Sequence, residues 1–265
     1  MSSWLETCRA CVADIERVLE QLPTRAEREP VLRLGEGGDD TTAIDEAAEQ
    51  AVVARLEATG ESFVLVSEEL GTLEFGAGGP VHLVVDPIDG SVNAKRGIPF
   101  FSFSLAVAEG PTMAEVVFGY VYDFGTGEEW TVERGRGAFL GGARLGAVRP
   151  KEPIEILSFE GTTTEAIAAQ IPRVTDLAAR LRVMGSLALS LCHLAAGRVD
   201  AVCSLKGARS VDIAAAQLLV RECALAIELV GATPLAAAPL DLAARARVVA
   251  AATPEVVASL SSALE

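Results

Sequence analysis

Two short apolar segments that each end in acidic residues constrain this chain more than any other feature of its sequence. Residues 63–66 are followed by Glu68 and Glu69, and residues 81–85 are followed by Asp86. Short apolar runs bounded by polar residues predict buried strands. Because a rigid sheet commonly carries reactive groups at the ends of its strands, we interpret the two acidic groups as parts of one functional site.

The pattern of expected elements changes about halfway along the chain. Apolar residues at helical spacing predict helices at residues 5–22 and 42–58, and a series of strands follows up to residue 133. Successive strands predict a largely antiparallel or mixed sheet. After residue 150, strands alternate with helices, as in an α/β lobe. We therefore expect an α/β (α+β) fold, with an N-terminal lobe of residues 1–150 and a smaller C-terminal lobe of residues 151–265.

The expected strands and helices can be assigned to residue ranges. Strands are expected at residues 63–66, 81–85, 102–108, 115–122, 129–133, 154–158, 199–204 and 247–251. Further helices are expected at residues 165–170, 186–196, 211–223 and 254–264. Residues 24–40 and 71–80 are expected to lack regular structure, and the glycines at 135–142 to form tight turns.

The chain is strongly acidic. Its 265 residues include 22 Lys and Arg against 37 Asp and Glu, which gives a formal net charge of −15. Such a charge repels nucleic acid and anionic membranes, so neither is an expected partner. A site for an anionic substrate in this chain therefore requires a bridging cation or a local basic patch.

The five cysteines do not have the even number and regular spacing of a secreted, disulfide-rich domain. Cys8 and Cys11 are three positions apart in an expected helix, and we interpret them as part of its buried face. The first residues lack the charged and apolar regions of a signal peptide, and no uncharged stretch is long enough to cross a membrane. We expect a cytoplasmic protein.

The segment from Asp86 to Ser91 combines cation ligands with anion donors. Proline stiffens the turn, so the carboxylates of Asp86 and Asp89 can converge on one point, where their repulsion requires a proton or a cation. Oxygen-only ligands favour Mg²⁺ or Mn²⁺ over zinc, and the chain has only two histidines. Backbone N–H groups of Gly90 and Ser91 can bind an anion. Taken alone, the segment is equally compatible with a solvated acidic turn.

Four segments in order resemble the inositol monophosphatase family. Residues 84–93 (Val-Val-Asp-Pro-Ile-Asp-Gly-Ser-Val-Asn) are very similar to its central motif. Residues 42–45, 67–69 and 211–215 resemble its N-terminal Thr-x-x-Asp helix, its Glu-Glu element and its C-terminal motif. The resemblance covers nearly the whole chain and implies a layered αβαβα sandwich of the sugar-phosphatase type. Residues 97–101 are most similar to the archaeal-type branch, some members of which also hydrolyse fructose 1,6-bisphosphate.

The resemblance also implies the metal ligands. Glu68, Asp86 and the carbonyl oxygen of Ile88 would bind a first Mg²⁺. Asp86, Asp89 and Asp212 would bind a second. A weaker third ion near Glu68 is usual in the family, so two to three ions are implied for each site, and Mn²⁺ would be able to replace Mg²⁺.

The catalytic residues implied by the resemblance are Asp45, Glu68 and Ser91. Asp45 and Ser91 would orient the attacking water, with Ser91 standing where the family commonly has Thr. The backbone N–H groups of Gly90 and Ser91 would hold the phosphate, with Asp89 beside it. Asp45 and Asp212 each have a simpler interpretation, because a carboxylate near the start of a helix is favoured by the helix dipole alone.

The substrate contacts are implied by two segments of the C-terminal lobe. Gly185 and Ser186 match a segment that lines the substrate pocket, although Ser186 could equally cap the helix that follows it. Lys206 and Arg209 lie where the family recognises the hydroxyls or the second phosphate of its substrate. Leu205 stands where inositol-selective members tend to have an acidic residue, which disfavours strict selectivity for inositol.

These features predict a Mg²⁺-dependent phosphoric monoester hydrolase that converts myo-inositol 1-phosphate to inositol and phosphate with a metal-activated water. Fructose-1,6-bisphosphatase, alone or as a second activity, and histidinol-phosphatase are alternatives, because the metal chemistry does not select the substrate. A catalytically silent homologue that binds metal or sugar phosphate is an alternative from another class. A dehydrogenase lacks support, since no G-x-G-x-x-G follows a strand.

The resemblance implies three further properties of the chain. Family members are often inhibited by Li⁺, and a homodimer is their usual state. Many members carry a lysine near position 36, where this chain has Glu36. The loop around Glu36 is therefore expected to hold its ion differently.

Overall fold

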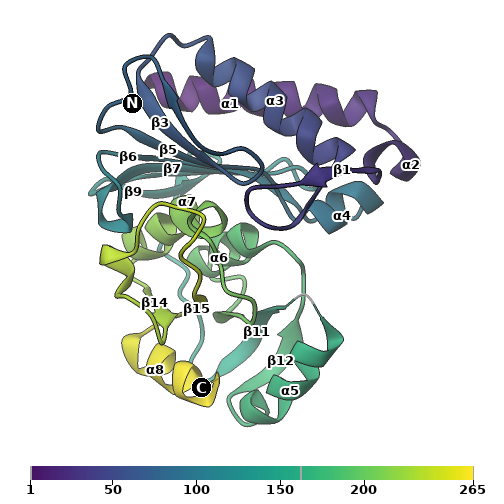
Figure 1. Cartoon of the computed structure of the whole chain (residues 1–265). Coiled ribbons are helices and arrows are strands. Elements are labelled where there is room, and N and C mark those ends of the chain that lie inside the picture. Colours follow the sequence, from purple (N-terminus) through teal and green to yellow (C-terminus); the bar gives the residue numbers. More distant parts are fainter. Residues whose placement is uncertain (1, 162, 265) are drawn as a thin grey trace.

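Five alternating layers of helix and sheet make up the computed structural model, which describes residues 2–161 and 163–264 (Figure 1). An eight-stranded sheet and a five-stranded sheet are each covered by helices on both faces. The outer layers are α1 (Ser2–Gln21) with α3 (Ala43–Glu57) and α5 (Thr164–Val174) with α8 (Pro254–Leu264), and the central layer is α6 (Leu187–Ala195) with α7 (Ser210–Glu222). The expected α/β sandwich with two sheets of unequal size is confirmed.

The eight-stranded sheet is antiparallel except for one pair of strands. Its strands lie in the order β10 (Ala143–Arg144), β9 (Gly137–Leu140), β8 (Glu129–Glu133), β7 (Val116–Asp123), β6 (Ser102–Ala108), β5 (His82–Asp89), β3 (Phe63–Ser67) and β4 (Gly71–Phe75). β3 runs parallel to β5, so the carboxyl ends of both strands meet at one edge. This pairing brings the two acidic segments that follow them together.

The five-stranded sheet is mixed. Its order is β12 (Ala178–Arg182), β11 (Ile154–Glu160), β13 (Ala201–Ser204), β15 (Arg247–Ala251) and β14 (Ala226–Val230). β11 pairs in parallel with β12 and β13, whereas β15 is antiparallel to β13 and β14. We propose that the two lobes divide near residue 150, between β10 and β11.

The central helical layer joins the two sheets and fixes the position of α7. Its buried apolar residues pack with side chains of both sheets in one cluster. Gly119 of β7 allows this close approach, because a Cβ there would lie 3.0 Å from the Cα of Ala215 and 2.8 Å from a methyl group of Val132. The first turn of α7, which carries Asp212, is thereby held against the eight-stranded sheet.

The expectation that residues 24–40 and 71–80 lack regular structure is wrong. They contain α2 (Arg25–Arg28), β1 (Val31–Leu34), the start of β2 (Asp40–Thr42) and β4. β1 and β2 form a small separate hairpin, and β4 is an edge strand. The strands β9, β12 and β14 were also not expected. All of these strands except β9 lie at a sheet edge or in the isolated hairpin. Such strands are half solvated, so they lack the continuous apolar run that identifies a buried strand.

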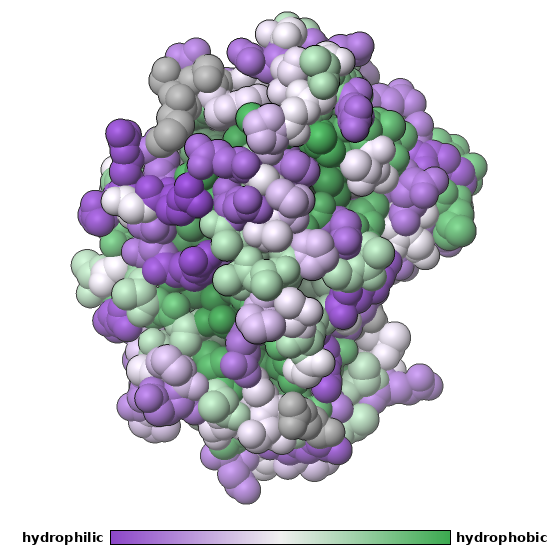
Figure 2. Space-filling view, turned by 60° about the vertical axis from the view of Figure 1, so that its left-hand side comes forward, coloured by the Kyte–Doolittle hydropathy of each residue, from purple (hydrophilic) through white to green (hydrophobic). Residues whose placement is uncertain are grey.

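The remaining elements are short: α4 (Ser91–Arg96) and the 3₁₀ helices η1 (Met113–Glu115) and η2 (Leu235–Ala237). Cys8 and Cys11 lie in the core under α1, which confirms their assignment to a buried helix face. On the face shown in Figure 2, hydrophilic and hydrophobic residues are intermixed. Within the described residues, no helix combines the length and apolar character needed to cross a membrane.

Candidate active site

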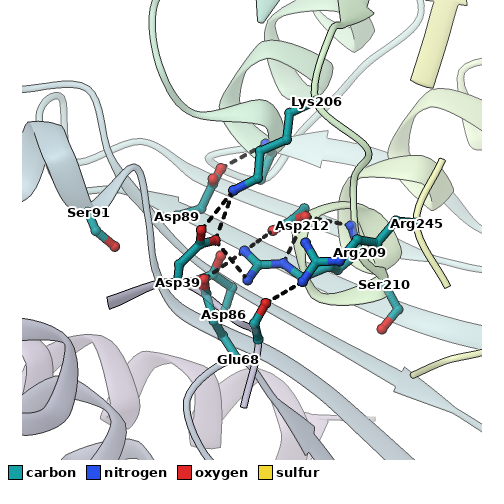
Figure 3. A network of polar contacts seen from close by, with 12 residues as sticks. Asp39, Glu68, Asp86, Asp89, Ser91, Lys206, Arg209, Ser210, Asp212 and Arg245 are labelled. Atoms are coloured by element: carbon teal, nitrogen blue, oxygen red, sulfur yellow. Dashed lines mark hydrogen bonds and ion pairs between the residues drawn. The ribbon is translucent and has the colours of Figure 1, made fainter. Parts of the chain in front are cut away.

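Three carboxylates from three different elements converge at the centre of the site (Figure 3). Glu68 follows β3, Asp86 lies on β5, and Asp212 lies in the first turn of α7. One carboxylate oxygen of each lies within 4.8 Å of those of the other two. An oxygen-only set at this separation suits a hard divalent cation such as Mg²⁺, Mn²⁺ or Ca²⁺.

Local backbone contacts orient two of these carboxylates. Asp86 Oδ1 accepts a hydrogen bond of 2.9 Å from the N–H of Ile88, which closes the turn around Pro87. Asp212 Oδ2 accepts a hydrogen bond of 2.6 Å from the N–H of Arg209 at the start of α7. Asp212 is thus a helix-capping residue, as its position suggests, and it also reaches the acidic cluster.

Burial makes the charged state of this cluster costly. Burial, together with repulsion from Asp212, raises the pKa of Glu68 to about 8, although the positive charge of Arg209 acts to lower it. Burial and the neighbouring carboxylates raise the pKa of Asp86 well above its usual range. Carboxylates with raised pKa values ionise together only when a cation compensates their charge. The residues present therefore fit a metal site.

Arg209 supplies a buried positive charge to the same cluster. Its Nη2 lies 2.6 Å from Glu68 Oε1 and 2.9 Å from Asp212 Oδ1, and its side chain is 7% exposed. We expected Arg209 to recognise substrate. The structure pairs it with two of the three converging carboxylates.

Asp89 lies beside the three-carboxylate cluster and connects β5 to α6. Its Oδ2 accepts hydrogen bonds of 2.5 Å from Ser186 Oγ and 2.8 Å from the N–H of Ala188. Ser186 Oγ also accepts a hydrogen bond from the N–H of Leu189 and so caps α6. The capping interpretation of Ser186 is therefore confirmed. Ser186 itself does not line the cavity, but it contacts a candidate metal ligand that does. Burial raises the pKa of Asp89 to about 7, against the lowering effect of the Ser186 bond.

The segment after Asp89 depends on a glycine. Gly90 has a φ of 98°, and a Cβ there would lie 3.1 Å from the carbonyl oxygen of Gly185. Gly90 is therefore suited both to the left-handed conformation and to the close approach of the C-terminal lobe. The hydroxyl of Ser91 donates a hydrogen bond of 3.1 Å to the carbonyl oxygen of Ile88.

Asp45 has one satisfied and one unsatisfied carboxylate oxygen. Its Oδ2 accepts a hydrogen bond of 3.0 Å from the N–H of Thr42 in a capping box at the start of α3. Its Oδ1 is buried and has no partner among the described residues. The same is true of Glu49 Oε2, one turn later. Both side chains line a water-sized cavity that adjoins the main one, together with Glu68 and Ser91. An unpaired buried carboxylate oxygen is costly, so a water molecule or a cation is its expected partner.

A cavity of about 450 Å³ brings the predicted site residues together. All of them except Ser186 line it, and Ser186 reaches it through Asp89. Lys206 lies on the wall formed by the C-terminal lobe, where its Nζ is 2.8 Å from Asp39 Oδ2. Glu36 is exposed and does not line the cavity.

Three cavity residues were missed or misjudged from the sequence. Glu160 ends β11, and its Oε2 accepts a hydrogen bond of 2.8 Å from the N–H of Gly185. The rule that strands end in functional acidic residues would have identified it. Asp39 follows the glycines of the β1–β2 loop, and no local pattern marks it. Glu69, to which the resemblance assigned no role, is buried and lines the cavity, where it accepts a hydrogen bond from Thr41.

Comparison with known proteins identifies the relatives of this chain. The family model described as "Inositol monophosphatase family" matches residues 5–265. A fructose-1,6-bisphosphatase/inositol-1-monophosphatase of Methanothermobacter thermautotrophicus is 32% identical over 229 residues, which are 83% of this chain and 81% of the relative. A protein of Pasteurella multocida named Nus factor SuhB is 34% identical over 190 residues, 69% of each chain.

Solved structures show the same similarity. A structure titled as an inositol monophosphatase-fructose 1,6 bisphosphatase superposes with a TM-score of 0.85 at 25% identity. The superposition covers 98% of this chain and 99% of the other. The layered sandwich is therefore similar to the fold of this solved phosphatase structure.

Proposed function

The chain belongs to the inositol monophosphatase family and is a phosphoric monoester hydrolase, and on that premise we propose that it hydrolyses myo-inositol 1-phosphate with Mg²⁺ as its metal. The products are inositol and inorganic phosphate. The observation that carries this proposal is the convergence of Glu68, Asp86 and Asp212 beside the segment of Gly90 and Ser91. Cation ligands and anion donors thus line one cavity.

The acidic residues divide into two candidate ligand sets. Glu68, Asp86 and the Ile88 carbonyl oxygen would hold one ion, and Asp86, Asp89 and Asp212 would hold a second. When bound, Mg²⁺ supplies a water of lowered pKa and neutralises charge on the phosphoryl group. Asp89 keeps its orientation through its bonds to α6, so its carboxylate is fixed before substrate binds.

The chain's own groups would position the reactants. Asp45 Oδ1, which has no partner among the described residues, would accept a hydrogen bond from the attacking water, and the Ser91 hydroxyl, which lines the same small cavity, would help to orient that water. The N–H groups of Gly90 and Ser91 donate to the phosphate oxygens, where negative charge develops. Positioning and electrostatic stabilisation are the main requirements of phosphoryl transfer, because little covalent chemistry falls to the protein.

Fructose 1,6-bisphosphate is the second candidate substrate. Lys206 and Arg209 place two positive charges on the cavity wall of the C-terminal lobe, where a second phosphate of a substrate would benefit from them. A relative's name combines both activities, which supports testing both for this chain. Leu205 gives no acidic group for the inositol hydroxyls, which also favours a broader substrate range.

A substrate panel tests the proposal. Phosphate release would be measured from myo-inositol 1-phosphate, fructose 1,6-bisphosphate and histidinol phosphate, in Mg²⁺, in EDTA and in Mg²⁺ with Li⁺. We expect Mg²⁺-dependent release, highest from inositol 1-phosphate and reduced by Li⁺. Metal binding without release from any of the three would instead support a catalytically silent homologue. A homodimer, inferred from the family resemblance, would be checked by light scattering.

A further inference from the structure

Asp39 forms ion pairs with both basic residues on the cavity wall of the C-terminal lobe. Lys206 Nζ lies 2.8 Å from Asp39 Oδ2 and 3.1 Å from Oδ1. Arg209 Nη1 lies 3.5 Å from Oδ2. Figure 3 shows the Asp39 carboxylate joined by dashed lines to both cationic side chains, next to the converging carboxylates. An anion of the protein itself thus occupies the basic part of the cavity.

The loop that carries Asp39 is packed against the site. The N–H of Gly37 donates a hydrogen bond of 2.8 Å to the Glu68 carbonyl oxygen, and Arg245 donates one to the carbonyl oxygen of Gly37. A Cβ at position 37 would lie 2.6 Å from Arg209 Nη1 and 2.9 Å from the Glu68 carbonyl oxygen. The glycine therefore lets the loop pass between Glu68 and Arg209 and present Asp39 to the cavity.

Asp39 is charged at neutral pH in this position. Partial burial opposes its ionisation, but the hydrogen bond from Lys206 and the charges of Arg209 and Arg245 outweigh burial and lower its pKa. Arg209 is shared, since it also pairs with Glu68 and Asp212. Lys206, in contrast, forms an ion pair with no described residue other than Asp39.

We propose that the Asp39 carboxylate occupies the position that the second phosphate of a sugar bisphosphate would take, so that Asp39 is a specificity-determining residue. The inference rests on the proposed phosphatase function. A monophosphate leaves the contact between Asp39 and Lys206 intact. A bisphosphate must displace the carboxylate, and its affinity is reduced by the free energy of the contacts that are broken.

The exchange is chemically feasible because a phosphate group is the stronger competitor. It carries a charge of about −1.5 to −2 at neutral pH and three acceptor oxygens, whereas a carboxylate carries one charge on two oxygens. Both the Asp39 and Lys206 side chains are about half exposed, so their contact is of modest strength. Asp39 therefore reduces the affinity for a bisphosphate without abolishing it.

Isothermal titration calorimetry with Asp39→Asn tests the inference. The two probes are fructose 1,6-bisphosphate and fructose 1-phosphate, which differ by the second phosphate alone. Ca²⁺ replaces Mg²⁺, and a phosphate assay on the same samples checks that no turnover occurs. We expect Asp39→Asn to bind the bisphosphate roughly three- to fivefold more tightly than the wild type, with the affinity for fructose 1-phosphate within about twofold.

Asp40→Asn is the matched control. Asp40 is the next residue, at the start of β2, and it lines the same cavity. No ion pair involves it among the described residues, so its loss changes only the general negative charge. We expect Asp40→Asn to shift both Kd values by the same factor. We also expect Lys206→Met to weaken the binding of the bisphosphate more than the binding of fructose 1-phosphate.

The inference is overturned if Asp39→Asn leaves the ratio of the two Kd values as in the wild type. It is also overturned if the substitution strengthens the binding of fructose 1-phosphate relative to that of the bisphosphate. It is equally overturned if Asp39→Asn does not bind the bisphosphate. Phosphate release by the wild type in Mg²⁺ separates this result from the proposed function. If the wild type hydrolyses its substrates but Asp39→Asn leaves the ratio of the two Kd values unchanged, the inference is wrong and the proposed function stands. If the wild type binds both probes but hydrolyses no phosphate ester, the proposed function is wrong, and the measured Kd values still test the inference.

Discussion

The guanidinium of Arg209 lies 2.6 Å from the carboxylate of Glu68, and both side chains are largely buried. The same nitrogen lies 2.9 Å from Asp212, so one arginine bridges two candidate metal ligands on opposite lobes. A buried charge without a partner is strongly destabilising. Arg209 therefore provides compensation for the acidic cluster before any metal binds.

Replacing Arg209 should make the fold depend on metal. We expect Arg209→Met to lower the free energy of unfolding by about 3 kcal/mol in EDTA, because buried carboxylates lose their partner. Saturating Mg²⁺ should recover a large part of this loss, since the ion compensates the same charges. Urea unfolding of wild type and variant in both conditions measures this.

Arg9→Met is the control for that experiment. Arg9 forms a surface ion pair with Glu129, and neither residue lines the cavity. Loss of this pair should lower the free energy of unfolding by less than about 1 kcal/mol in either condition. Equal destabilisation of Arg209→Met in EDTA and in Mg²⁺ would contradict the proposed compensation.

Replacing Asp45 should impair turnover more than substrate binding. We expect Asp45→Asn to lower kcat by about 10²- to 10⁴-fold with little change in KM, because an amide cannot take the proton of the attacking water. Steady-state kinetics with inositol 1-phosphate measure both constants. Glu46→Gln, the next residue, which pairs with Arg33 outside the cavity, should retain the kcat of the wild type. A kcat for Asp45→Asn within threefold of the wild type would rule out the assigned role.

Glu160 is expected to act as a positioning residue. It accepts hydrogen bonds from the N–H of Gly185 and from the hydroxyl of Ser190. The residue that follows Gly185 is Ser186, whose hydroxyl donates a hydrogen bond to Asp89. Glu160→Ala should therefore raise the Mg²⁺ concentration for half-maximal activity roughly tenfold, the usual effect of losing support behind a ligand. Glu160→Gln, which keeps one of the two acceptor oxygens, should recover part of the lost Mg²⁺ affinity. A change in stability alone, with an unaltered Mg²⁺ requirement, would show that Glu160 is merely structural.

The stability of the metal-free protein should fall as the pH rises, partly through Glu49. Burial raises the pKa of Glu49 to about 7, against the lowering effect of its bond with Ser67. The native state therefore holds a proton that the unfolded state releases at lower pH, and stability is lost between about pH 4.5 and pH 7.

Substitution of Glu49 by glutamine isolates this effect. Glu49→Gln should remove on the order of 2 to 3 kcal/mol of the difference in unfolding free energy between pH 5 and pH 7.5, measured in EDTA. The other buried carboxylates contribute with the same sign in both proteins, so they cancel in the comparison. An identical pH dependence in wild type and variant would show that Glu49 does not titrate in this range.

The parts of the fold that the sequence predicted are those with a strong local signal. The buried strands β3 and β5 have continuous apolar runs, and α7 has a helical apolar face, so Glu68, Asp86 and Asp212 could be placed at their ends. The resemblance to a family then grouped these residues into one site. Their convergence itself depends on the parallel pairing of β3 with β5, which no local pattern specifies.

The parts that were missed depend on contacts between distant residues. Asp39 and Lys206 are 167 positions apart, and nothing near either residue indicates that they meet. β4 is half solvated at the sheet edge and so lacks a buried strand's pattern. Glu160, in contrast, lies two residues after the predicted strand at 154–158, as Glu68 lies two residues after the one at 63–66, and could have been recognised by the rule that found the acidic residues there.

Phosphate release from myo-inositol 1-phosphate tests the central claim most directly, comparing the wild type with Asp89→Asn in Mg²⁺ and in EDTA. Asp176→Asn, at an exposed position outside the cavity, is the control. We predict release by the wild type and the control in Mg²⁺ only, and a loss of at least roughly 100-fold in Asp89→Asn, because a candidate metal ligand is removed. Equal rates for Asp89→Asn and the wild type would contradict the assignment of this site.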